Sequence, residues 1–134
     1  LDTNGSYPDR LAALMDEGLL DYVAMDVKNS REKYAQTVGI KNFDTAPIEQ
    51  SIALLRSSGV PFELRTTVVK ELHETQDIVS IAKRISGAKK YFLQGYVDSG
   101  DLINDGFSAY SASEMLDILE ATRQILPITV LRGV

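Results

Sequence analysis

Short apolar runs alternate along this chain with stretches in which apolar residues recur every three or four positions. Runs of the first kind are typical of buried strands, and stretches of the second kind are typical of amphipathic helices. Their regular alternation predicts βαβ units, and therefore an α/β fold with a parallel sheet. The predicted strands cover residues 1–3, 22–28, 60–69, 90–96 and 128–131, and the predicted helices cover about 8–18, 30–38, 45–57, 74–85 and 111–125.

Caps and helix breakers mark the ends of the predicted helices. Pro8 suits the first position of the first helix, and Pro127 ends the last one. Serine and threonine side chains accept hydrogen bonds from free N–H groups at helix starts. The candidate N-caps are Ser30, Thr45 and either Ser111 or Ser113.

The composition limits the partners that the chain can have. Its 134 residues, 44% of them hydrophobic and 25% charged, fit one globular domain over residues 1–134. A net charge of -5 without a basic stripe argues against a nucleic-acid partner, because such binding needs clustered lysine and arginine. No apolar run approaches the ~20 residues of a membrane span, and no secretory leader is seen. We therefore expect no membrane partner and a cytoplasmic location.

Cysteine is absent and histidine occurs once, as His73. The chain therefore offers no thiolate nucleophile, no disulfide and no cysteine ligand for zinc or an iron–sulfur cluster. The usual multi-histidine metal sites and Ser/His/Asp arrangements also lack the residues that they need.

Polar residues gather where the predicted strands end. Ligands of parallel α/β folds bind at the carboxyl ends of the strands, so these positions are the candidate site. Because side chains alternate along a strand, Asp26 and Lys28 should share one face, as should Arg65 and Thr67. The polar strand ends are Asp2-Thr3-Asn4-Gly5, Asp26-Val27-Lys28, Arg65-Thr66-Thr67 and Gln94-Gly95-Tyr96.

Two acids and two bases at neighbouring strand ends suit a zwitterionic ligand. A carboxylate prefers arginine or lysine, while an ammonium group or a ribose hydroxyl prefers aspartate. An amino-acid-bearing nucleoside fits that description. The alternative is purely structural: Asp26 and Lys28 form an ion pair, and Asp2 with Asn4-Gly5 makes a turn.

Three of these segments resemble consecutive strands of the glycyl-radical-enzyme activating proteins, the activators of pyruvate formate-lyase and of anaerobic ribonucleoside-triphosphate reductase. They are Leu1-Asp2-Thr3-Asn4-Gly5, Met25-Asp26-Val27-Lys28 and Arg65-Thr66-Thr67-Val68-Val69, in matching order and spacing. The resemblance extends from residue 1 to about residue 95. It implies that the chain is the C-terminal half of a partial (β/α)6 TIM-like barrel.

The resemblance also implies a radical S-adenosylmethionine activity for the parent protein. In that family a [4Fe-4S] cluster on three cysteines binds S-adenosylmethionine, and reductive cleavage gives a 5′-deoxyadenosyl radical that takes hydrogen from a glycine of the partner enzyme. Flavodoxin or ferredoxin is the expected electron donor. Because the cluster cysteines are absent here, we expect no catalytic residue in this part and no activity from it alone.

Site residues carry over from the family to the polar strand ends. Asp2 and Asp26 would lie near the methionyl end of the cofactor, and a monovalent cation beside them would also contact Thr3. Lys28 and Arg65 would contact the carboxylate or the ribose. Each of these assignments rests on the resemblance.

One strand end departs from part of the family. Gln94 occupies roughly the position from which another cofactor-contacting residue comes. The activators of pyruvate formate-lyase tend to have a histidine after this strand, where this chain has Gln94-Gly95-Tyr96. The difference favours the branch that activates ribonucleotide reductase, or a relative outside both.

Two other functions fit parts of the same pattern. Lys28 at a strand end would also serve as the Schiff-base lysine of an aldolase-like half-barrel. The chain would alternatively be a non-catalytic α/β interaction module.

Three further features are interpreted structurally. His73 lies among acidic residues before a helix, which predicts a surface position rather than a ligand or base. The acidic stretch 98–106 lacks the ligand spacing of a calcium loop and is interpreted as a connection. Tyr91, Phe92 and Tyr96 are expected to pack in the core rather than to stack on nucleic-acid bases.

Overall fold

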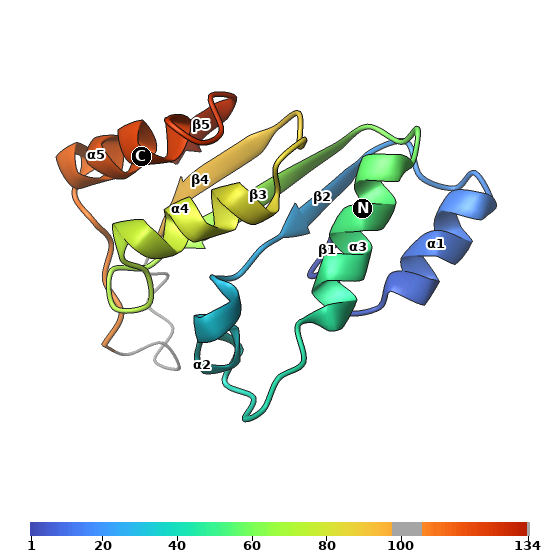
Figure 1. Ribbon diagram of the computed structural model, residues 1–134, viewed down its shortest axis with the longest axis horizontal. Helices are drawn as coiled ribbons and strands as arrows, with labels where there is room; N and C mark the ends of the chain where they lie inside the picture. Colours follow the sequence, from blue (N-terminus) through green and yellow to red (C-terminus); the bar gives the residue numbers. More distant parts are fainter. Residues whose placement is uncertain (98–105, 134) are drawn as a thin grey trace.

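A computed structural model describes residues 1–97 and 106–133 of the chain. One parallel sheet with the strand order β1-β2-β3-β4-β5 runs through it, and helices connect the strands (Figure 1). The strands are β1 (Asp2–Thr3), β2 (Val23–Asp26), β3 (Phe62–Val68), β4 (Tyr91–Gly95) and β5 (Thr129–Arg132). The helices are α1 (Pro8–Asp16), the 3-10 turn η1 (Arg31–Lys33), α2 (Tyr34–Val38), α3 (Ala46–Ser57), α4 (Thr75–Arg84) and α5 (Ala112–Arg123).

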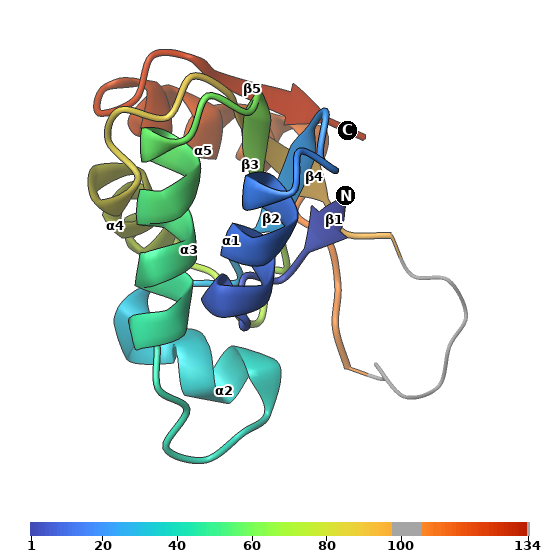
Figure 2. The same ribbon diagram turned by 90° about the vertical axis from the view of Figure 1, so that its right-hand side faces the viewer.

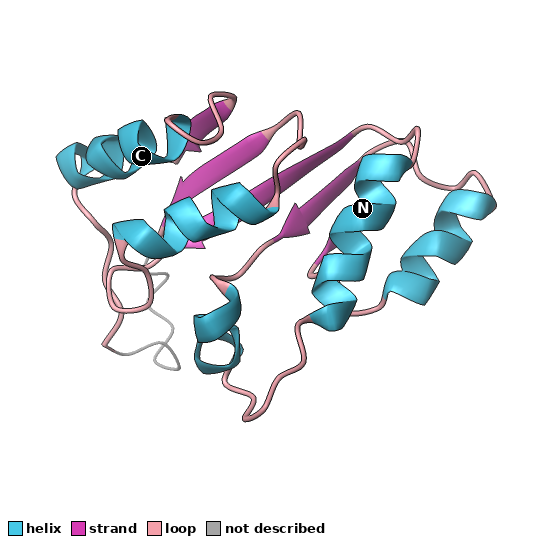
Figure 3. Ribbon diagram, viewed as in Figure 1, coloured by secondary structure: helices cyan, strands magenta, loops and turns pink. Residues whose placement is uncertain are grey.

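The helices lie on one face of the sheet, and the other face carries none of them (Figure 2). Helix α1 packs beside α3, and α4 packs beside α5 (Figure 3). The sheet is open, with β1 and β5 at its two edges. This is the predicted α/β architecture, with strands and helices in the arrangement of a partial (β/α) barrel.

The core lies between the helices and the sheet. Met25, Leu64 and Leu93 point from three strands toward the helices and are fully buried. They pack in one cluster with Ile52 of α3 and Ile78 of α4. Since neighbouring residues of a strand face opposite sides, the residues next to these three point to the helix-free face.

The turn after β1 is fixed by a glycine with a left-handed backbone. Gly5 has φ +73°, and its carbonyl accepts a 2.7 Å hydrogen bond from the buried Ser51 hydroxyl of α3. A Cβ atom on Gly5 would overlap the end of the Met25 side chain. Glycine is therefore required here by both backbone conformation and space.

Two of the predicted caps do not cap. Thr45 precedes α3, but its side chain makes no cap hydrogen bond, and Asp44 accepts the Ala46 N–H instead. Ser30 precedes η1, and its hydroxyl donates to Asp77 rather than capping. In the structure, the helix predicted over residues 30–38 is a 3-10 turn, η1, followed by the five-residue α-helix α2.

The cap of α5 is confirmed. Ser111 accepts the Glu114 N–H at 3.1 Å, and the Glu114 carboxylate accepts the Ser111 N–H at 3.0 Å. This reciprocal pair is a capping box. Over the described part of the chain, none of the helices is both long and apolar enough to span a bilayer.

Candidate functional site

Charged side chains from three strands meet on the helix-free face, at the carboxyl ends of the strands. In the parallel register, Asp26 pairs with Arg65, so both side chains face the same way. The Arg65 Nε donates to Asp26 Oδ1 at 2.7 Å, and its Nη2 lies 3.6 Å from Asp2 Oδ1. The guanidinium thus links two carboxylates. We call Asp2, Asp26, Lys28 and Arg65 the charged rim.

Lys28 completes the charged rim from just beyond the end of β2. Its Nζ donates to Asp26 Oδ2 at 3.2 Å, while Arg65 takes the other oxygen of the same carboxylate. The sequence prediction that Asp26 and Lys28 share a face is confirmed. Two acids and two bases gather at one edge, so the charges of the rim balance.

The two basic groups of the rim differ in exposure. The Arg65 side chain is 18% exposed, whereas that of Lys28 is 42% exposed. Burial disfavours the Arg65 charge, but the hydrogen bond and the charge of Asp26 outweigh it and raise the pKa of Arg65 above its ordinary value. Arg65 is thus a fixed cation, and Lys28 is the one with room to turn toward a ligand.

The remaining predicted site residues lie in two different places. Gln94 pairs in register with Thr67, whose hydroxyl donates to Gln94 Oε1 at 3.4 Å on the helix-free face. Gln94 therefore extends the rim by one strand. Thr3 pairs with Met25 and so faces the helices, and its hydroxyl accepts the Gly5 N–H at 3.1 Å. Its side chain is not gathered with the charged rim.

His73 is buried, and the prediction that it lies on the surface is wrong. Its side chain is in the turn between β3 and α4, and the residue is only 2% exposed. Nδ1 accepts the Val69 N–H at 3.0 Å, so the proton of the neutral ring is on Nε2, which donates to the Lys28 carbonyl at 2.7 Å. The acidic neighbours in the sequence suggest exposure, but the ring folds back under the rim.

Because His73 is buried, we expect the stability of the protein to depend on pH. Burial lowers the pKa of His73 below the ordinary 6.5, so the unfolded chain takes up a proton at higher pH than the folded chain. The contribution of His73 to the free energy of unfolding should be complete above about pH 6.5. Below that pH the free energy of unfolding should decrease, by at most ~1.4 kcal/mol per pH unit. Denaturant unfolding between about pH 5 and 6.5 measures this slope, since carboxylates with ordinary or lowered pKa values titrate below that range.

The variant His73→Gln should lose the slope in that range. Carboxyl groups with a lowered pKa, such as Asp77, change the stability of the protein only at more acidic pH. Their stabilising contribution is lost as the pH falls through their own pKa values. An unchanged slope in the variant would contradict the assignment of the pH dependence to His73.

A second polar cluster lies on the helix-free face, toward the amino end of β3. Glu63 accepts hydrogen bonds from the Tyr22 hydroxyl and from Arg132, each at 2.9 Å. The Arg132 guanidinium lies 3.7 Å from the centre of the Phe92 ring. This cluster pairs its charges internally and joins β3, β4 and β5, so we interpret it as structural.

The prediction that Tyr91, Phe92 and Tyr96 pack in the core is confirmed for Tyr91 but wrong for Phe92 and Tyr96, which are half-buried and lie outside the core cluster. Tyr91 is fully buried in the core, as expected. Phe92 lies under Arg132 on the helix-free face, and the Tyr96 ring meets Phe107 edge-on at 6.4 Å. Residues 98–105 of the acidic stretch lie outside the described residues.

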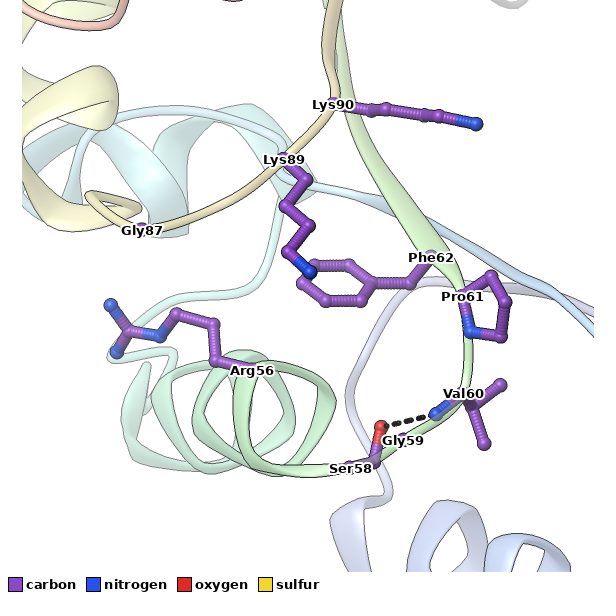
Figure 4. Close-up of a pocket in the computed structure, with 9 residues that line it drawn as sticks. All are labelled: Arg56, Ser58, Gly59, Val60, Pro61, Phe62, Gly87, Lys89 and Lys90. Atoms are coloured by element: carbon purple, nitrogen blue, oxygen red, sulfur yellow. Dashed lines mark hydrogen bonds between the residues drawn. The ribbon is translucent and has the colours of Figure 1, made fainter.

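A cavity lies at the other end of the strands from the charged rim. It has a volume of about 300 Å³ and is lined at the amino ends of β3 and β4 by Arg56, Lys89 and Phe62, among others (Figure 4). The Arg56 Nη1 already donates to the Ser86 carbonyl at 2.7 Å. Since ligands of parallel α/β folds bind at carboxyl ends, the charged rim is the better candidate.

The charged rim combines two carboxylates with two cationic groups. Within residues 1–97 and 106–133, no three His, Cys, Asp or Glu side chains come together as a metal site would require. With no cysteine in its 134 residues, the chain also supplies no ligand to an iron–sulfur cluster.

A curated protein matches the sequence. A Methanocaldococcus jannaschii protein named as a glycyl-radical enzyme activating enzyme is 34% identical over 100 residues, which cover 72% of this chain and 41% of that protein. The chain therefore spans less than half of the length of this relative. No protein-family model matches the chain.

A solved structure matches the fold. A domain of pyruvate-formate lyase-activating enzyme from Bacteroides vulgatus superimposes with a TM-score of 0.73 and 12% sequence identity. The match covers 98% of this chain and 79% of that domain. The likeness shows that both have the same arrangement of strands and helices.

Proposed function

We propose that the charged rim forms one wall of an S-adenosylmethionine site, because the chain belongs to the glycyl-radical-enzyme activating enzymes. The observation that carries the proposal is the network from Asp2 through Arg65 and Asp26 to Lys28. It combines two cations and two carboxylates at the strand ends where ligands of such folds bind.

The donor set of the rim fits the polar groups of S-adenosylmethionine. The methionyl carboxylate needs a cation, for which Lys28 and Arg65 are available. The methionyl ammonium and the ribose hydroxyls need acceptors, for which Asp2 and Asp26 are available. Gln94, with an amide that both donates and accepts, would contact the ligand from the next strand.

The chain would hold and orient the ligand, and the rest of a longer protein would supply the cluster. In this family the [4Fe-4S] cluster delivers the electron that cleaves S-adenosylmethionine. We propose that Arg65, fixed by Asp26, sets the ligand's orientation, while Lys28 closes onto it. A monovalent cation near Asp2 and Asp26 would have to bind beside the guanidinium that links them.

The same resemblance indicates the partner that the parent protein would activate. The partner would be a glycyl-radical enzyme of the anaerobic ribonucleotide reductase or pyruvate formate-lyase type, and a flavodoxin or ferredoxin in the cytoplasm would supply the electron. Gln94 in place of a histidine supports the ribonucleotide reductase branch.

Cleavage of S-adenosylmethionine by the full-length protein, meaning this chain with whatever precedes and follows it, tests the proposed function. The protein, purified without oxygen and supplied with iron and sulfide, should form 5′-deoxyadenosine and methionine when dithionite is added. A protein that assembles no cluster, or that leaves S-adenosylmethionine intact, would contradict the proposal.

The aldolase-like alternative finds less support in the geometry. An amine nucleophile is activated by desolvation or by a cationic neighbour. Lys28 instead is 42% exposed and lies 3.2 Å from the carboxylate of Asp26. Borohydride trapping of a carbonyl compound on Lys28 would nevertheless favour that alternative over the activating function.

A further inference from the structure

The main chain of Lys28 is held on both sides by buried side chains. The regular ladder of β2 ends at Asp26, and the Val27 N–H makes the last strand-like hydrogen bond, to the Arg65 carbonyl at 2.8 Å. The next peptide groups need other partners. The Lys28 N–H donates to the Tyr34 hydroxyl at 3.1 Å, and the Lys28 carbonyl accepts from His73 at 2.7 Å.

Both of these partners are themselves fixed. Tyr34 is 1% exposed and its ring stacks on Phe43 with 5.5 Å between centroids. His73 is held at Nδ1 by the Val69 N–H, and its own carbonyl accepts from the Tyr110 hydroxyl at 2.6 Å. Side chains from α2 and from the turn after β3 thus converge on one residue of the rim.

The segment after Lys28 is anchored in the same way. The Asn29 amide donates to the Leu72 carbonyl at 2.9 Å and to the Thr37 hydroxyl at 2.8 Å. These contacts fix where the chain leaves the sheet. The exposed Lys28 side chain therefore projects from a rigid main chain, with its ammonium directed at Asp26.

We propose that His73 and Tyr34 are positioning residues that fix the Lys28 main chain and thereby aim its ammonium at the ligand on the charged rim. The proposal rests on the proposed function for the identity of that ligand. The same two side chains do not reach the ligand site themselves, because both are buried. Misplacement of a contact group by about 1 Å is enough to weaken its effect substantially.

Double-mutant cycles with Lys28 separate positioning from general support of the fold. In the reconstituted full-length protein, His73→Phe should weaken S-adenosylmethionine binding about tenfold, as measured by isothermal titration without reductant. His73→Gln, whose amide can donate to the Lys28 carbonyl, should restore most of the affinity. In a Lys28→Met background, His73→Phe should have no further effect on affinity.

A matched control removes a buried hydroxyl elsewhere. Thr122 of α5 is fully buried and donates to the Ile118 carbonyl at 2.7 Å, so Thr122→Val also removes a buried hydrogen bond. It should lower the melting temperature without weakening binding. Equal losses of affinity in Thr122→Val and His73→Phe, or an undiminished effect of His73→Phe in the Lys28→Met background, would overturn the positioning role.

Amide hydrogen exchange of Lys28 gives a readout that needs no ligand. Exchange should become faster in Tyr34→Phe and His73→Phe, but not in Thr122→Val. If the wild-type protein fails to bind S-adenosylmethionine, the proposed function is wrong, and the exchange of this amide still decides whether the two residues hold Lys28. Unchanged exchange in both variants would overturn the inference.

Discussion

Replacing Arg65 with methionine is expected to weaken S-adenosylmethionine binding by about 10- to 100-fold, because charge-assisted hydrogen bonds contribute roughly 1.5–3 kcal/mol. Methionine keeps much of the length and volume of the side chain but removes the guanidinium. The loss should include two effects: the missing contact to the ligand, and Asp2 and Asp26 left without the cation that links them. Isothermal titration of the full-length protein with S-adenosylmethionine, without reductant, measures the change.

Arg132→Met is the matched control for this substitution. Arg132 also lies on the helix-free face, in register with Gln94, and its carboxylate partner at 2.9 Å is Glu63 rather than an aspartate of the charged rim. We expect the affinity of the Arg132→Met variant for S-adenosylmethionine to stay within about twofold of the wild-type value. Equal losses in the two variants would show that any broken ion pair on this face weakens binding, which would contradict a specific role for Arg65.

The second large effect is expected at the turn after β1. Gly5→Ala should lower the free energy of unfolding by about 2–4 kcal/mol, as the sum of an unfavourable left-handed backbone and overpacking against Met25. The new Cβ would overlap the end of the Met25 side chain, so this buried side chain would have to move. Urea unfolding of the full-length protein measures the loss.

Gly18→Ala isolates the backbone part of this effect. Gly18 has a similar φ of +68°, and nothing lies within 4 Å of the position that an alanine Cβ would take, so only the conformational cost of about 1 kcal/mol is expected. A loss in Gly5→Ala no larger than that in Gly18→Ala would mean that Met25 moves aside freely. In that case, adding Met25→Leu to the Gly5→Ala variant would restore none of the lost free energy of unfolding.

The strand and helix pattern could be predicted because the apolar periodicity and the turn residues agree with each other. The sequence predicts one strand over residues 22–28, yet β2 ends at Asp26. The difference arises because Lys28 hydrogen-bonds to Tyr34 and His73 instead of to β3, and such long-range partners leave no local pattern. The failed cap at Thr45 has a local cause, because the neighbouring Asp44 accepts the free N–H instead.

The charged rim could be predicted because strand alternation and parallel register together determine which residues face each other. Asp26 and Arg65 come together for that reason, although 39 residues separate them in the sequence. The side chains beneath the rim could not be predicted in this way. His73 lies in a turn, where no periodicity indicates which way a side chain points, and its acidic neighbours wrongly suggest exposure.

The most direct test of the account is the position of S-adenosylmethionine in a crystal structure of the full-length protein. We predict that the polar groups of the ligand lie within hydrogen-bonding distance of Arg65 and of Asp26 or Lys28, on the helix-free face. A ligand bound elsewhere, for example in the cavity lined by Arg56 and Lys89 at the amino ends of β3 and β4, would contradict this prediction.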